Sequence, residues 1–162
     1  HADGAERFRQ LTGAPVRSLD PQYSSGADPL VDGEVVAVDG ITPRLKVVAT
    51  PGHTSDSVCF FVYPGAPDSS ELEAVVTGDT ITGRHTTMIS ETDGDLGDYL
   101  DSLELLEEQG KDITLLPGHG PEGADLSAYA RKYIDRRNQR LEQIREALPP
   151  VLRRVRAIID RD

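Results

Sequence analysis

Two histidines and one aspartate each follow directly after a run of residues typical of a buried strand. His53 lies in the string TPGHT, Asp79 in TGDT and His119 in LPGHGP. Glycine lets the backbone turn sharply, so that the next side chain points into a shared cleft at the strand ends. Neutral imidazole and carboxylate are ligands that Zn²⁺ takes in catalytic sites, where one position stays open for water. The pattern predicts a His/Asp metal site.

Each of these strings also has a simpler interpretation. A histidine after Pro-Gly is often a turn residue that makes an ordinary hydrogen bond, and Gly-Asp is a common turn pair. Three such strings, in order and each behind a strand, are less expected by chance than any one of them. From the residues alone, both interpretations stay open.

The elements that would position these residues are short strands followed by helices. The expected strands are Glu34–Val38, Arg44–Ala49, Ser57–Tyr63, Ala74–Thr77 and Ile113–Leu116. The expected helices are Ala2–Leu11, Gly94–Gln109, Leu126–Leu148 and the start of one over Val151–Ile159. In the second helix, Leu96, Leu100, Leu103 and Leu106 fall on one face. Because strands and helices do not alternate regularly, the order predicts a layered α/β sandwich rather than a doubly wound parallel fold.

Charge and cysteine content narrow the classes of function. The net charge is −11, but residues 1–130 carry −16 and residues 131–162 carry +5. An acidic body repels nucleic acid, whereas the basic end could attract it or could simply be a solvated helix face. The single cysteine, Cys59, excludes an internal disulfide framework and is expected to be a buried, inert thiol. With no apolar run long enough to span a bilayer, we expect no membrane association and a reducing, cytoplasmic setting.

The ordered strings resemble the metallo-β-lactamase superfamily, and within it the branch around β-lactamase-like protein 2. The opening HADGA matches the end of the superfamily's first ligand string, and PGHT, GD and PGHG match its later ligand loops. GRHTT, LGDYL and SL, beginning at residues 83, 96 and 102, also resemble this branch. The resemblance implies a partial αββα sandwich over residues 1–124 and a C-terminal helical appendage over 125–162, the start of a winged-helix-like module. It also implies a chain truncated at both ends.

The resemblance assigns roles to individual residues. His53 would bind a first zinc ion, His1 and His119 a second, and Asp79 would bridge the two. The other ligands would precede residue 1, so we expect the fragment alone to be inactive. At position 85, where relatives usually have glycine, His85 is either a proton donor in the cleft or a residue of the loop surface. Thr86 and Thr87 would be a substrate-side pair of hydroxyls, or simply strand-edge threonines.

The function implied by the resemblance is that of a di-zinc hydrolase. A metal-bound hydroxide would attack a small ester, thioester or lactone. The alternative is a metal-dependent endoribonuclease or phosphodiesterase that binds single-stranded RNA through the basic C-terminal end. A mononuclear iron oxygenase and a catalytically silent binding domain are further alternatives. A homodimer or the missing N-terminal half would cover the exposed sheet.

Overall fold

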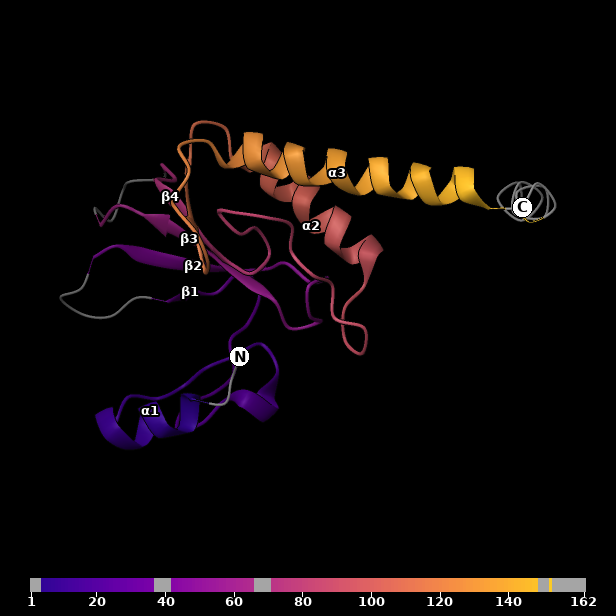
Figure 1. Cartoon of the computed structure of the whole chain (residues 1–162). Helices are drawn as coiled ribbons and strands as arrows, with labels where there is room; N and C mark the ends of the chain where they lie inside the picture. The colour runs from indigo at the N-terminus through magenta and orange to yellow at the C-terminus, as the bar shows by residue number, and fades with distance from the viewer. Residues whose placement is uncertain (1–3, 37–41, 66–70, 149–151, 153–162) are drawn as a thin grey trace.

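The described part of the chain forms one mixed β-sheet with helices packed on it (Figure 1). The computed structural model describes residues 4–36, 42–65, 71–148 and 152. Along the chain the elements are α1 (Ala5–Thr12), the 3₁₀ turn η1 (Pro21–Tyr23), β1 (Val35–Val36), β2 (Arg44–Ala49), β3 (Val58–Tyr63), β4 (Ala74–Gly78), α2 (Leu96–Gln109), β5 (Thr114–Pro117) and α3 (Leu126–Ala147).

The five strands lie side by side in chain order. β1, β2, β3 and β4 pair antiparallel, whereas β5 pairs parallel to β4. A parallel pair needs a crossover connection, and α2 provides it. Because β4 and β5 run in the same direction, the loops that follow them leave the sheet at the same edge, and this edge carries Asp79 and His119.

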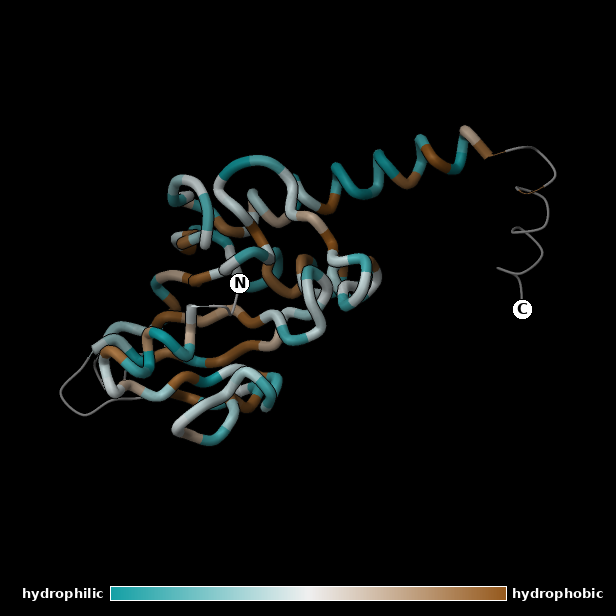
Figure 2. Tube along the Cα trace, turned by 60° about the horizontal axis from the view of Figure 1, so that its bottom comes forward, coloured by the Kyte–Doolittle hydropathy of each residue, from teal (hydrophilic) through white to brown (hydrophobic). Residues whose placement is uncertain are grey.

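The core lies between one face of the sheet and the helices α2 and α3. Cys59 and Phe61 of β3, Val75 of β4 and Leu115 of β5 are almost fully buried. Directly paired residues share a face of the sheet, and Phe61 pairs with Val75, which in turn pairs with Leu115. Figure 2 shows hydrophobic residues concentrated along the strands, while the outer part of α3 alternates in hydropathy. The sheet therefore has its helix layer on this face, as in one half of an αββα sandwich.

The helix ends follow recognisable capping signals. α1 ends at Gly13, whose φ of 72° lets its N–H bond the carbonyl of Arg9. α2 starts after Asp95, whose side chain accepts from the N–H groups of Gly97 and Asp98, so the predicted start at Gly94 was two residues early. α3 begins behind Asp125, which caps it in the same way.

The buried stripe of α2 differs from the predicted one. Tyr99, Ser102, Leu103 and Leu106 are buried, whereas Leu96 and Leu100 are only half-buried. Tyr99 takes the inner position because its hydroxyl donates to the buried carbonyl of Thr80 at 2.8 Å. A tyrosine with such a partner can be fully buried.

The predicted strands agree with β2 over its whole length and with β3, β4 and β5 to within one residue. Of the strand expected over Glu34–Val38, β1 covers Val35–Val36, and residues 37–41 lie outside the described residues. Of the helix expected over Val151–Ile159, only Leu152 is described. The boundary between 1–124 and 125–162 stays a prediction, although the first turns of α3 contribute Leu126 and Ala130 to the core.

The N-terminal segment lies on the side of the sheet opposite α2 and α3 (Figure 1). Arg17 joins it to the sheet edge through two hydrogen bonds to Glu34, of 2.8 and 2.9 Å. This guanidinium lowers the pKa of the Glu34 carboxyl group. None of the helices in the described part of the chain is both long enough and apolar enough to cross a bilayer.

Candidate metal centre

His53 lies in the turn that leaves β2, and α2 fixes the position of that turn. Gly52 has a φ of +130°, and a Cβ there would lie 2.3 Å from Cα of Tyr99. Only glycine therefore lets the turn pack directly on the helix backbone. The hydroxyl of Ser102, one turn further along α2, donates to the carbonyl of Pro51 at 2.8 Å and also holds the turn on the helix.

Asp79 and His119 come from the loops after the parallel strands β4 and β5. The N–H of Gly118 donates to the carbonyl of Gly78 at 2.8 Å, so the two loops are joined beyond the last paired residues. A Cβ at Gly118 would lie 3.0 Å from that carbonyl oxygen and 3.2 Å from Oδ1 of Asp79. The glycine before His119 thus allows the two loops to approach closely.

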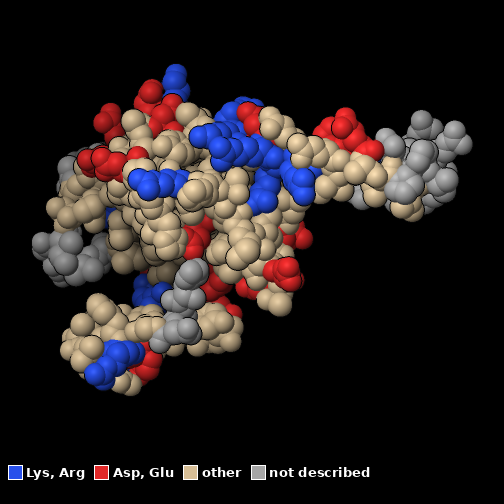
Figure 3. Space-filling model, viewed as in Figure 1, with Lys and Arg blue, Asp and Glu red and all other residues tan. Residues whose placement is uncertain are grey.

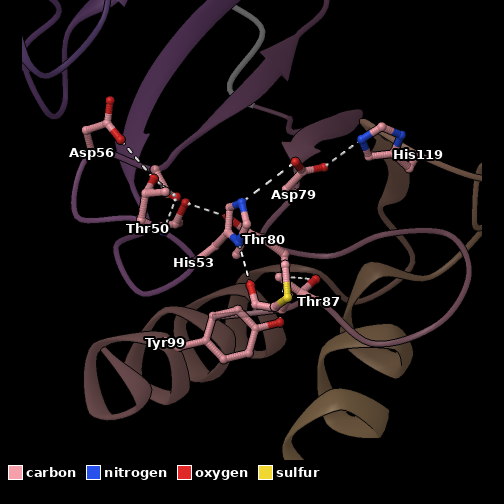
Figure 4. A network of polar contacts seen from close by, with 11 residues as sticks. Thr50, His53, Asp56, Asp79, Thr80, Thr87, Tyr99 and His119 are labelled. Atoms are coloured by element: carbon pink, nitrogen blue, oxygen red, sulfur yellow. Dashed lines mark hydrogen bonds and ion pairs between the residues drawn. The ribbon is translucent and has the colours of Figure 1, made fainter. Parts of the chain in front are cut away.

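The three side chains predicted from the sequence meet at one point (Figure 4). Oδ1 of Asp79 lies 3.3 Å from Nε2 of His119, and Oδ2 lies 3.7 Å from Nε2 of His53. One carboxylate therefore faces two imidazoles, one with each oxygen. The side chains of His53 and Asp79 are 17% and 20% exposed, whereas that of His119 is 69% exposed, so the site opens on the His119 side.

The other ring nitrogen of His53 fixes the orientation of the imidazole. Nδ1 lies 2.5 Å from the carbonyl oxygen of Met88. A carbonyl can only accept, so Nδ1 carries the proton and, in a neutral ring, Nε2 presents its lone pair toward Asp79. Metal-binding histidines show this arrangement, with the far nitrogen donating to a carbonyl or carboxylate. The donor chemistry of His53, Asp79 and His119 therefore fits part of a metal site.

The described residues do not complete such a site. Among them, no group of three or more His, Cys, Asp or Glu side chains is placed to hold a metal ion. His1, the fourth ligand expected from the sequence, lies outside the described residues.

A pocket of about 410 Å³ opens beside the three side chains, and we call it the histidine pocket. It contains the other three residues singled out from the sequence. His85 and Thr86 are exposed at its edge, and Thr87 is buried, with its hydroxyl donating to the carbonyl of Thr80 at 3.3 Å. The pocket is lined by His53, Asp79, Thr82, Arg84, His85, Thr86, Thr87, Met88, His119 and Gly120.

A second pocket of about 490 Å³ shares His53 and Asp79 with the first. Its other walls come from the N-terminal segment, including Arg17 and Tyr23, from the turn between β2 and β3, and from Thr80 and Asp93. Here Asp56 accepts from the hydroxyl groups of Ser18 and Thr54, at 3.2 and 2.8 Å. Polar groups therefore lie on both sides of His53 and Asp79.

Buried hydroxyl groups beneath the site were not foreseen from the sequence. The hydroxyls of Thr50 and Thr80 lie 3.2 Å apart, and that of Thr50 lies 3.3 Å from Sγ of Cys59. Cys59 is buried as predicted, and its burial raises the pKa of the thiol to about 11. Thr50 is the first residue of the TPGH string and Thr80 the last of the GDT string, so a local signal existed, but their mutual contact is visible only in the fold.

Comparison with known sequences gives relatives of one kind, although no family model matches the chain. The chain is 35% identical, over 94% of its length, to the atrochrysone carboxyl ACP thioesterase of Aspergillus fumigatus. It is 36% identical, over 72% of its length, to the β-lactamase-like protein 2 homologue of Caenorhabditis elegans. It spans 44% and 35% of the lengths of these two relatives.

Solved structures give the same result. A metallo-β-lactamase family protein of Thermus thermophilus superposes with a TM-score of 0.62 at 25% identity, over 90% of this chain and 49% of that protein. A second protein, solved in a di-iron-bound form, superposes with a TM-score of 0.57 at 20% identity, over 81% of this chain and 69% of that one.

Proposed function

Because this chain belongs to the metallo-β-lactamase superfamily and carries one half of its αββα sandwich, we propose that it is part of a metal-dependent hydrolase acting on thioesters. The observation that carries the proposal is the Asp79 carboxylate, which faces Nε2 of both His53 and His119 beside an open pocket.

In this proposal His53 and His119 hold metal through Nε2, and Asp79 lies between them with one oxygen toward each. His1 and residues outside this chain would supply the remaining ligands. When bound, a divalent metal such as zinc would polarise the substrate carbonyl and lower the pKa of a water molecule. Met88 keeps the His53 ring in the tautomer that presents the Nε2 lone pair to the metal.

The substrate class is supported by both sequence and pocket. The A. fumigatus relative is named a thioesterase that acts on an acyl group attached to a carrier protein. Hydrolysis would add water across the C–S bond, which gives a carboxylic acid and a free thiol. The histidine pocket of about 410 Å³ is large enough for the acyl end of such a substrate.

The residues at the pocket edge have proposed roles in this reaction. The imidazole of His85 is exposed at the edge and would give a proton to the departing thiolate. The hydroxyl of Thr86, also exposed, would contact the substrate. We give Thr87 a supporting role beside it, because its hydroxyl is already bonded to Thr80.

The test is metal content and thioester turnover of the whole protein that contains this chain. Asp79→Asn keeps the shape of the side chain but removes its charge. We expect this variant to lose its bound metal and to have a kcat/KM that is lower by about 100-fold or more. Asp93→Asn is the matched control, since Asp93 lies in the second pocket and accepts from the N–H of Ser55. Mass spectrometry gives the metal content, and release of free thiol gives the rate.

The results separate the proposal from its competitors. Full turnover by the Asp79→Asn variant contradicts the proposed site. Iron instead of zinc favours oxygenase chemistry on the same fold, and a wild-type protein that binds no metal and turns over no thioester favours a silent binding domain. Hydrolysis of a matched oxygen ester at the same rate broadens the substrate class from thioesters to esters.

A ribonuclease remains the second candidate, because one observation favours it. Lys and Arg side chains gather over the first half of α3 (Figure 3), and Arg131, Lys132, Arg136 and Arg140 are exposed there. Phosphate contacts release counterions, so binding of single-stranded RNA through this stripe would weaken steeply with salt. Cleavage of RNA with this salt dependence, without thioester turnover, would replace the first proposal.

A further inference from the structure

The histidine pocket is bordered by one segment, residues 82–90, which we call the rim segment. It is bonded to the loops of both metal-facing histidines. The N–H of Gly83 donates to the carbonyl of His119 at 2.8 Å, and the N–H of Ser90 donates to the carbonyl of His53 at 3.0 Å. The carbonyl of Met88 accepts from the ring of His53. A shift of the rim segment would therefore move both histidines.

Tyr133 of α3 forms hydrogen bonds with the rim segment. Its side chain is buried among core residues, and its hydroxyl oxygen lies 2.7 Å from the carbonyl of His85 and 2.8 Å from both the carbonyl and the hydroxyl of Thr82. The Thr82 hydroxyl donates to the carbonyl of Arg84 at 2.5 Å. With the Thr82 proton given to Arg84, the single proton of Tyr133 is shared among three acceptors of the rim segment: the carbonyls of Thr82 and His85 and the Thr82 hydroxyl oxygen.

The hydrogen bond to the carbonyl of His85 holds a strained part of the backbone in place. His85 has a φ of 67°, a left-handed backbone conformation that is strained for a residue with a side chain. A strained residue persists only when its surroundings hold it in place. The Tyr133 hydroxyl bonds this residue two positions before Thr87.

Arg137, one helical turn after Tyr133, provides the second support. Its guanidinium donates to the carbonyl of Thr87, and its Cζ lies 5.3 Å from the ring centroid of Tyr99. A cation over the face of a buried aromatic ring is attracted to it, so this contact favours the place of the guanidinium beside Thr87. The residue after Thr87 in the chain is Met88, whose carbonyl holds His53.

We propose that Tyr133 and Arg137 are positioning residues of the histidine site: α3 holds the rim segment through them, and the rim segment orients the metal-binding face of His53. The inference rests on the metal site of the proposed function but not on its substrate. Neither residue touches the site directly.

The chain offers a matched control for each variant. Tyr133→Phe removes only the hydroxyl group, and Tyr129→Phe makes the same change on the same helix, where the ring packs against Gly123 instead. Arg137→Met removes the guanidinium over Tyr99, and Arg140→Met removes an exposed one that bonds Gln143.

The first measurement is amide hydrogen exchange in the whole protein without metal. The amides of Gly83 and Ser90 report on the rim segment, and that of Leu115, which donates to the carbonyl of Gly123, reports on the core. We expect Tyr133→Phe and Arg137→Met to speed exchange at Gly83 and Ser90 about tenfold relative to Leu115. The two control variants should leave this ratio unchanged. The comparison with Leu115 separates local loosening from global destabilisation.

The second measurement is the zinc dissociation constant, from competition with a chelator. We expect it to rise about tenfold in Tyr133→Phe and Arg137→Met, the effect typical of losing a partner that orients a ligand. Equal zinc affinity in Tyr133→Phe and Tyr129→Phe overturns the proposal, and so does faster exchange of the rim segment with unchanged zinc affinity. If the wild-type protein binds no divalent metal, the proposed function fails, and the exchange ratio alone then decides whether α3 holds the rim segment.

Discussion

At the scale of single residues, the candidate site depends on which atom each neighbour presents. Met88 acts through its backbone carbonyl, and this carbonyl determines the tautomer of His53. Asp79 presents one oxygen to each histidine, although it comes from a different strand than either. The chemistry of the site therefore depends on a backbone atom as much as on the side chains recognised in the sequence.

His85 provides a test at this scale, because its side chain and its backbone can be separated. His85→Gly and His85→Ala both remove the imidazole, but only glycine relieves the φ of 67°. We expect the glycine variant to be more stable than the alanine variant by about 1 kcal/mol in urea unfolding. At the neighbouring Arg84, whose φ is not positive, we expect the opposite order: the alanine variant should be more stable than the glycine variant.

Activity of the same two variants tests the proposed proton donor. If the His85 imidazole protonates the leaving thiolate, both variants should lose kcat about equally, by about 10²-fold or more. Because their stabilities differ, an equal loss cannot be attributed to folding. Unchanged kcat in both variants would place His85 on the loop surface without a catalytic role.

At the scale of elements, the turn after β2 must pack on α2 before His53 can reach Asp79. We expect Gly52→Ala to destabilise the fold through strain at φ +130° and through the 2.3 Å approach to Tyr99. Gly33→Ala is the control, since Gly33 has a φ of +80° but no atom within 4 Å of its added Cβ. Strain alone should cost Gly33→Ala about 1–2 kcal/mol, and overpacking should add about 1–3 kcal/mol at Gly52. Equal unfolding free energies for the two variants would contradict this account.

The elements also show what the sequence could predict. The sequence singled out His53, Asp79 and His119, which lie together in the fold, because Pro-Gly and Gly-Asp turns after strands are local signals. Met88, Tyr133 and Arg137 were missed because they act on, or through, backbone carbonyls in contacts that join residues 35 to 50 positions apart in the chain. No residue-type pattern marks such a contact, and Tyr133 has the spacing of an ordinary core position of α3.

A similar limit explains the error in α2. The leucine spacing placed Leu96, Leu100, Leu103 and Leu106 on one face, and the last two are buried, but a neighbouring face that includes Tyr99 and Ser102 fits the periodicity almost equally well. The choice between the two faces was made by the Tyr99 hydroxyl and its partner on Thr80, which belongs to the loop after β4. Local periodicity thus predicted the helix but not its rotation.

At the scale of the whole molecule, the sheet and α2 enclose two groups that cannot ionise without cost. Burial raises the pKa of the Cys59 thiol from 9.0 to about 11 and that of the Tyr99 phenol from 10.0 to about 12. In each case the neutral form is favoured in the folded state. The stability that these groups contribute is therefore fully present below pH 9 and is lost as the pH rises through 9–11 for Cys59 and 10–12 for Tyr99.

The resulting prediction is a loss of unfolding free energy of about 2 kcal/mol between pH 8 and pH 10, measured by urea unfolding of the metal-free protein. Most of this loss comes from Cys59, because the pKa of its thiol in the unfolded chain, 9.0, is one unit below that of the Tyr99 phenol, 10.0. Cys59→Ala should start from lower stability at pH 8 but lose much less over the same interval, since alanine does not titrate. Tyr99→Phe should behave like the wild type up to about pH 10 and fall less steeply than the wild type above it, because only Cys59 still titrates. If Cys59→Ala and the wild type lost equal stability between pH 8 and pH 10, the thiol would have to ionise as freely in the fold as in the unfolded chain, which its complete burial against Thr50 does not allow.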